Sequence, residues 1–125
     1  MNLHELESTL TEHEISYDYV WKYGPDKGKT ETMTDVFDWS YWMHETPAEG
    51  VDIPGVGHVS REAQHGGEGE GDQAWVVLRI EHEDGQTKYY RKDGYYASFD
   101  GMYFDGDFSE VTPTPKTITV YKAVK

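Results

Sequence analysis

The sequence predicts an α+β domain that consists mainly of an antiparallel β-sheet, a meander, with a short N-terminal helix. Three observations predict this class. Aromatic or apolar side chains alternate with mostly polar ones in several segments, Asp-Gly pairs stand between several of these segments, and leucines recur at helical spacing near the start. Alternation with a period of two is typical of strands. Asp-Gly pairs readily adopt the positive φ values of tight turns, so they indicate short connections between antiparallel neighbours.

The helix is expected over residues 3–13. Leu3, Leu6 and Leu10 recur at positions i, i+3 and i+7, which places them on one helical face. Asn2 can cap the first turn, and Glu5 stands three residues later, as in a variant of the capping box. The chain is therefore expected to begin with a capped helix that has one apolar face.

The first half of the chain is expected to continue with one clear strand. In residues 14–24 every second position is aromatic or apolar, from Ile15 through three tyrosines and Trp21, and this period of two predicts a strand. Residues 30–44 fit either a helical face or a strand, and their aromatic content favours the strand. Residues 46–57 hold five Pro and Gly residues, so we expect a loop over the surface.

The second half is expected to form the meander. Residues 56–64 predict a strand, residues 74–83 are the most apolar segment and the candidate for a central strand, and residues 116–124 are expected to close the sheet. The glycine-rich residues 65–72 predict an exposed loop. Four Asp-Gly pairs are expected to form the turns of the meander: Asp84-Gly85, Asp93-Gly94, Asp100-Gly101 and Asp105-Gly106.

Length and composition indicate one folded domain. A chain of 125 residues buries about two-thirds of its extended surface on folding, so a single core over 1–125 is feasible. Lobes at 1–55 and 56–125 are the alternative. The absence of cysteine excludes disulfides and thiolate metal sites. Neither a signal peptide nor a membrane span is expected, and the composition fits a cytoplasmic protein.

Charge is the strongest global feature of the sequence. The chain has 24 acidic side chains against 11 Lys and Arg, a net charge of −13. Phosphate backbones and anionic membranes are held by positive side chains, so direct nucleic-acid binding and membrane binding are not expected. A basic protein partner is expected, because the negative field would steer it in. The ordinary alternative is that the charge only keeps a small domain soluble.

Motifs for catalysis or for metal and cofactor binding are missing from the sequence. The six histidines form no HExxH motif, and the Asp-Gly pairs lack the ligand spacing of an EF-hand. The glycine-rich loop lacks GxGxxG, and its acidic side chains would repel phosphate. We expect no enzyme, no metal and no cofactor.

Candidate contact residues come from two acidic and aromatic stretches. Residues 30–60 contain six acidic side chains and no Lys or Arg. This suggests DNA mimicry, in which carboxylates take the positions of DNA phosphates in the basic groove of a DNA-binding protein. Tyr-Tyr pairs on a strand send one ring to each face, so one ring of each pair is expected to face solvent. The candidate partner-binding residues are Asp35, Asp38, Trp39, Glu45, Tyr95, Tyr96, Phe99, Asp100, Asp105 and Asp107.

The last 60 residues resemble a type of small protein found in bacteriophages, mainly those of Gram-positive and actinobacterial hosts. Five matching stretches carry the resemblance: GGEGEGD at 66–72, WVV at 75–77, YYRKDGYYASFDG at 89–101, EVTP at 110–113 and KTITVYK at 116–122. The resemblance implies a phage accessory protein that binds and blocks a host protein, for example a defence nuclease. If a phage encodes the protein, the expected location is the cytoplasm of the host cell.

Together these observations favour a non-enzymatic, acidic binding protein that inhibits a host macromolecule, with DNA mimicry as its sharper form. A structural or assembly component of the virion, which would form homo-oligomers, is one alternative. A protein that sequesters a small ligand such as a nucleotide is the other, and it would need Arg79, Arg91 or Lys92 near the ligand.

Overall fold

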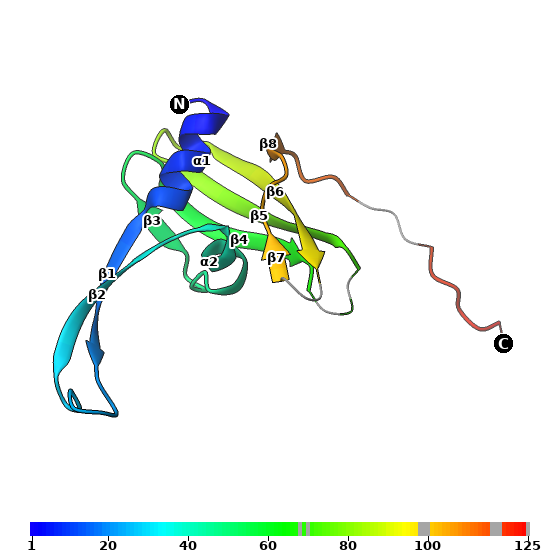
Figure 1. Ribbon diagram of the computed structural model, residues 1–125. Helices are drawn as coiled ribbons and strands as arrows, with labels where there is room; N and C mark the ends of the chain where they lie inside the picture. The colour runs from blue at the N-terminus through cyan, green and yellow to red at the C-terminus, as the bar shows by residue number, and fades with distance from the viewer. Residues whose placement is uncertain (68, 70, 98–100, 116–118, 125) are drawn as a thin grey trace.

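The structure is a computed structural model that describes residues 1–67, 69, 71–97, 101–115 and 119–124 (Figure 1). It confirms the α+β class, with a mainly antiparallel sheet and a short N-terminal helix. The elements are α1 (Leu3–Glu12), β1 (Glu14–Val20), β2 (Thr30–Val36), α2 (Trp39–His44), β3 (Val51–Ile53), β4 (Gly57–His65), β5 (Gln73–His82), β6 (Thr87–Ala97), β7 (Gly101–Tyr103) and β8 (Phe108–Val111).

Helix α1 forms as its sequence predicts. The side chain of Asn2 accepts a hydrogen bond from the backbone N–H of Glu5 at 2.8 Å and caps the first turn. Leu6 and Leu10 are buried, whereas Leu3 is exposed. The apolar face of the helix therefore packs inward from its second turn onward.

Strands β1 and β2 form a two-stranded antiparallel hairpin that projects from the body of the protein (Figure 1). The strand predicted at residues 14–24 is thus confirmed over Glu14–Val20, and residues 21–24 belong to the loop at the tip. The segment 30–44 is divided: it is a strand up to Val36 and then a helix from Trp39, so the preference for a strand was wrong for its second part. Asp38 causes the change, because its side chain accepts from the N–H of Tyr41 at 2.9 Å and caps α2.

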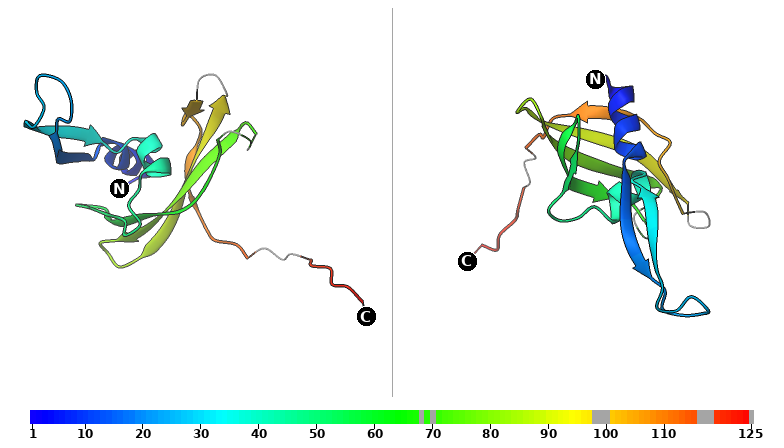
Figure 2. Two further views of the ribbon diagram at one scale, coloured as in Figure 1. Left: turned by 90° about the horizontal axis from the view of Figure 1, so that it is seen from below. Right: turned by 90° about the vertical axis from the view of Figure 1, so that its left-hand side faces the viewer.

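The second sheet has six strands in the order β3-β4-β5-β6-β7, with β8 also paired to β6. Strand β5 is central, as predicted, and its alternate side chains are buried. Figures 1 and 2 show α1 and α2 over one face of this curled sheet. The buried side chains of β5 are Ala74, Val76, Leu78 and Ile80.

The core lies between this sheet and the two helices, and it draws on residues from both the 1–55 and the 56–125 ranges. An ion pair joins the layers at its border. Lys92 of β6 is buried and contacts the carboxylate of Glu7 at 2.7 Å, and the indole N–H of Trp39 donates to the same carboxylate at 3.0 Å. Helix α1, helix α2 and strand β6 are thus held at one point.

Two predicted features of the second half differ from the structure. Asp93-Gly94 is no turn, because β6 runs through it without a break. A side chain at Gly94 would collide with the backbone carbonyl oxygen of Tyr103 in β7, so this glycine permits close strand contact instead. Residues 119–124 are exposed and have no regular structure, although residues 116–124 were expected to form a strand, of which 116–118 lie outside the described residues.

Other turns and loops follow the prediction more closely. Gly85 has a positive φ of 91°, and its N–H donates to the carbonyl of His82, which closes the β5–β6 hairpin as Asp84-Gly85 predicted. The predicted surface loop 46–57 contains the three-residue strand β3 at one edge of the sheet. The Tyr89-Tyr90 pair also divides as expected: Tyr90 is buried and Tyr89 lies on the sheet face away from the helices.

Candidate functional site

One face of the β1–β2 hairpin carries a row of exposed apolar side chains, here called the hairpin surface. Residues paired across an antiparallel ladder share a face, and β1 pairs Tyr17 with Met33. Tyr17 and Tyr19 remain 43% and 38% exposed. The hairpin surface consists of the exposed Ile15, Tyr17, Tyr19 and Trp21 together with the half-buried Met33.

Two carboxylates lie among these rings. Tyr17 donates its hydroxyl to Asp35 at 3.3 Å, and the indole N–H of Trp21 donates to Glu31 at 3.0 Å. The Asp35 carboxylate, more than any other group, raises the pKa of Tyr17 above its ordinary value. Rings and negative charges therefore alternate on this surface, a combination that suits a partner with both apolar and basic groups.

The opposite face of the hairpin is different in kind. It presents hydroxyl groups, with Ser16 within 3.4 Å of Thr34 and Thr32 donating to Asp18 at 3.1 Å. The loop at the tip carries Lys22, Lys27 and Lys29, while β1 and β2 hold acidic side chains and no Lys or Arg. The aromatic rings of β1 thus lie on one face, and the tip loop, which has three lysines and the single acidic residue Asp26, is more basic than the strands.

A pocket of about 320 Å³ opens at the foot of the hairpin surface. Three of the predicted contact residues, Asp35, Asp38 and Glu45, line it together with Tyr41 and His44. We call it the acidic pocket. The acidic side chains that the sequence suggested along one stretch are therefore brought together in space, next to the exposed rings.

The remaining predicted contact residues lie elsewhere. Trp39 is buried in the core, where it bonds Glu7, so it supports the fold instead of a contact surface. Tyr95 is 47% exposed, with its ring centroid 6.5 Å from that of Tyr103, whereas Tyr96 is half-buried. Asp105 and Asp107 are exposed between β7 and β8. Phe99 and Asp100 lie outside the described residues. This second group belongs to the β6–β8 region, apart from the acidic pocket.

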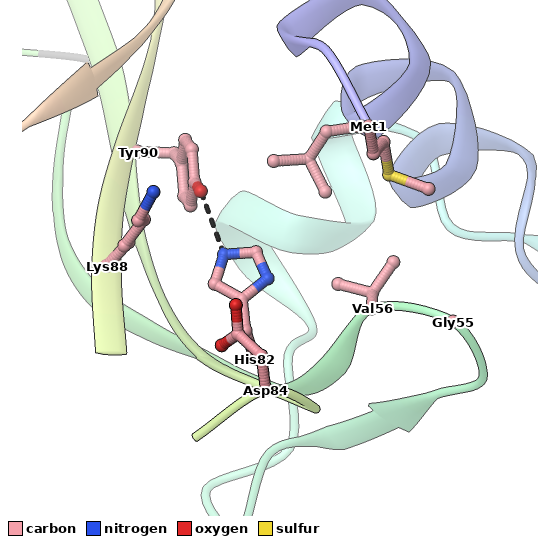
Figure 3. A pocket seen from close by; sticks show the side chains of 8 residues that line it. Met1, Gly55, Val56, His82, Asp84, Lys88 and Tyr90 are labelled. Atoms are coloured by element: carbon pink, nitrogen blue, oxygen red, sulfur yellow. Dashed lines mark hydrogen bonds between the residues drawn. The ribbon is translucent and has the colours of Figure 1, made fainter. Parts of the chain in front are cut away.

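A second pocket, of about 190 Å³, lies between α1 and the β5–β6 hairpin (Figure 3). Its polar lining is already paired: His82 and the Tyr90 hydroxyl are 2.8 Å apart, Asp84 accepts from the backbone N–H of Gln86, and Lys88 contacts Glu110 at 3.4 Å. Burial raises the pKa of Tyr90. Because these polar side chains already have partners within the fold, we assign the pocket a structural role.

Searches for other kinds of site bear on the described ranges. No group of three His, Asp or Glu side chains there gathers as a metal ion would require. No helix in the same ranges is long and apolar enough to cross a membrane. Comparison of the chain with protein-family models, with curated proteins and with solved structures gave no match.

Sequence reasoning missed the hairpin surface, although its signal was present. The alternation of Ile15, Tyr17, Tyr19 and Trp21 predicted a strand but not that its apolar face would stay uncovered. That outcome depends on where the other elements pack. A stretch of β-favouring aromatic residues with acidic neighbours and no second amphipathic partner nearby is the signal that could have indicated it.

Proposed function

We propose that this protein is a non-enzymatic binding protein that captures a basic protein partner with its hairpin surface and acidic pocket. One observation carries the proposal: an exposed aromatic face on a projecting hairpin, with carboxylates among and beside the rings. Exposed apolar patches rimmed by polar groups mark interaction sites on soluble proteins.

The two parts of the site would contribute differently. Tyrosine and tryptophan rings supply most of the binding energy at protein interfaces, because they bury large areas at a small entropic cost. The carboxylates of Asp35, Asp38 and Glu45 would instead attract the partner and select its charge. Charge that served only solubility would have no reason to concentrate beside exposed rings.

The resemblance of residues 66–122 to phage accessory proteins supports a narrower version of the proposal. In that version the partner is a host macromolecule, such as a defence nuclease or another DNA-binding protein, and binding blocks it. The acidic pocket would then occupy part of a basic groove that normally holds DNA phosphates.

A capture experiment at two salt concentrations tests the proposal. The immobilised protein is exposed to lysate of a bacterial host at about 0.05 M and about 0.5 M salt, and captured proteins are identified by mass spectrometry. We expect a basic protein that is retained at low salt and largely lost at high salt. The hairpin variant Tyr17→Ser/Tyr19→Ser should lose it.

The matched control is Tyr95→Ser/Tyr103→Ser, which removes two tyrosines of similar exposure from the other sheet. It should capture the same protein as the unchanged chain. Equal loss in both variants would contradict a specific role of the hairpin. Retention that is indifferent to salt would contradict the DNA-mimic version.

A small-ligand site is the second candidate, and it rests on the sheet face away from the helices. There the guanidinium of Arg91 lies 4.9 Å from the centre of the Trp75 ring, at a pocket of about 260 Å³. Arg91 already pairs with Asp93 at 2.7 Å, so a nucleotide would have to displace that carboxylate. Nucleotides should raise the melting temperature if this candidate is correct, and should leave it unchanged otherwise.

A further inference from the structure

Residues 119–124 are a β-favouring segment without a place in either sheet. Val120, Tyr121 and Val124 are 72%, 91% and 98% exposed, the highest exposures of large apolar side chains among the described residues of the second half. Residues 112–125 also contain three lysines and no acidic side chain, in a protein of net charge −13. The end of the chain is therefore a basic segment of strand-favouring residues attached to an acidic protein.

The β1–β2 hairpin has open strand edges and acidic side chains, which complement this basic segment. Within the described ranges β1 and β2 pair only with each other, so each leaves one edge of backbone N–H and C=O groups open. Two-stranded sheets are marginally stable, and a third strand stabilises them. The two strands hold four acidic side chains and no basic one: Glu14, Asp18, Glu31 and Asp35.

We propose that residues 119–124 of one copy pair as a third strand with β2 of a second copy. This inference rests on the hairpin as the binding surface, as proposed above, and names a second copy of the chain as one occupant. The addition of a strand to an open edge is a common mode of peptide recognition, in which backbone hydrogen bonds supply affinity and side chains supply specificity.

The side-chain patterns of the two strands fit each other. On the aromatic face β2 presents an acidic, an apolar and an acidic residue in turn, namely Glu31, Met33 and Asp35. One face of the segment presents an apolar, a basic and an apolar residue: Val120, Lys122 and Val124. Placing Lys122 beside either carboxylate also places a valine beside Met33. Opposite charges and apolar pairs at neighbouring positions both stabilise a sheet.

The arrangement of the chain favours contact between copies over contact within one. The hairpin and residues 119–124 lie on opposite sides of the body of the protein (Figures 1 and 2). The donor and acceptor surfaces are also different, so each copy can give a strand and receive one. Such a contact closes into a reciprocal dimer or ring, or continues as an open chain.

Two full-length variants test the inference by complementation. Val120→Asp/Val124→Asp damages the donor segment, and Glu31→Lys/Asp35→Lys damages the acceptor edge. Sedimentation equilibrium should show association of the unchanged protein, and at least about tenfold weaker association of each variant alone. An equimolar mixture of the variants should associate again, because each supplies the part that the other lacks.

Three results would overturn the inference: an unchanged protein that is monomeric at the highest soluble concentration, variants that associate as it does, or a mixture that stays monomeric. A second measurement covers the case in which the acceptor variant does not fold. A synthetic peptide of residues 112–125 is added to the donor variant, and amide chemical shifts are recorded by NMR. Changes should concentrate in residues 30–36, and their absence there counts against the inference.

Failure of this inference is distinguishable from failure of the proposed function. The donor variant keeps its hairpin surface intact, so in the capture experiment it should retain the basic partner at least as well as the unchanged protein. A protein that is monomeric but still captures the partner would contradict only the proposed self-association. A donor variant that associates with the added peptide but captures nothing from lysate removes only the foreign partner.

Discussion

The two sheets of this protein are both antiparallel, but they differ in what covers them. The six-stranded sheet buries one face under α1 and α2, and alternate residues of β5 are fully enclosed. The β1–β2 hairpin exposes both faces along its length. Similar residue types therefore have two different environments: aromatic rings on the six-stranded sheet and its helices pack in the core, and aromatic rings on the hairpin remain exposed.

The comparison is sharpest between two tryptophans. Trp42 is fully buried and donates its indole N–H to the carbonyl of Leu10 at 2.9 Å, whereas Trp21 is exposed on the hairpin. We expect Trp42→Ala to lower the free energy of unfolding by about 3–5 kcal/mol. Trp21→Ala should lower it by about 1–2 kcal/mol, because the ring is 36% exposed and packs beside Tyr19 on the hairpin instead of in the core. Urea unfolding measures both, and equal losses would contradict the division between the sheets.

Two glutamates make the same comparison for hydrogen bonds. Glu7 and Glu31 each accept from a tryptophan indole N–H at 3.0 Å, but only Glu7 also holds the buried Lys92. Glu7→Ala leaves that ammonium unpaired and should cost about 2–3 kcal/mol, since Glu7 keeps some solvent contact. Glu31→Ala should cost about 0.5 kcal/mol or less. Thermal unfolding measures both. Adding Lys92→Met to Glu7→Ala should restore most of the loss, and no recovery would show that the charge is not its cause.

Helix caps separate stability from binding. Asn2 and Asp38 each cap a helix with one side-chain hydrogen bond to a backbone N–H. Replacing either with Ala should cost about 1 kcal/mol of stability. Only Asp38→Ala should also weaken capture of the basic partner, because that carboxylate lines the acidic pocket. If Asn2→Ala weakens capture equally, the pocket has no specific part in it.

The smallest expected effect concerns the titration of Tyr17. Folding raises its pKa, chiefly through the Asp35 carboxylate, so the neutral phenol is favoured in the folded state. The associated stability is present below about pH 10, the ordinary pKa of tyrosine, and is lost as the pH rises through the folded pKa. Asp35→Asn should lower the pKa of Tyr17, as followed by NMR titration. Asp18→Asn, on the opposite face of the hairpin, is the control and should leave it unchanged.

Local signals in the sequence predicted local structure well. The Asn2 cap with Leu6 and Leu10 predicted α1, and Asp84-Gly85 predicted the β5–β6 turn, because neighbouring residues decide both. Asp93-Gly94 looked identical to Asp84-Gly85 but lies within β6. The environment of Gly94 is set by Tyr103 of β7, nine residues further along the chain. No pattern within the dipeptide distinguishes the two cases.

The candidate site was predictable only in part, for a related reason. Asp35, Asp38 and Glu45 were recognised from an acidic stretch, and the helical turn that begins at Asp38 brings them to one pocket. Trp39 lies within the same stretch but faces the core, and its burial depends on Glu7 at the other end of the first half. Exposure of the hairpin rings depends in the same way on where α1 and α2 pack, which alternation alone does not determine.

Only His13 separates α1 from β1, and Phe37 and Asp38 alone separate β2 from α2. The backbone N–H of Phe37 donates to the carbonyl of His13 at 2.9 Å, so a backbone hydrogen bond closes the base of the hairpin, where it joins the body. A strand of seven residues is about 23 Å long. A tilt of about 10° at that base would carry the tip through about 4 Å. A small change of angle at the base therefore moves the exposed rings near the tip by several ångströms, and the length of the hairpin sets the size of that movement.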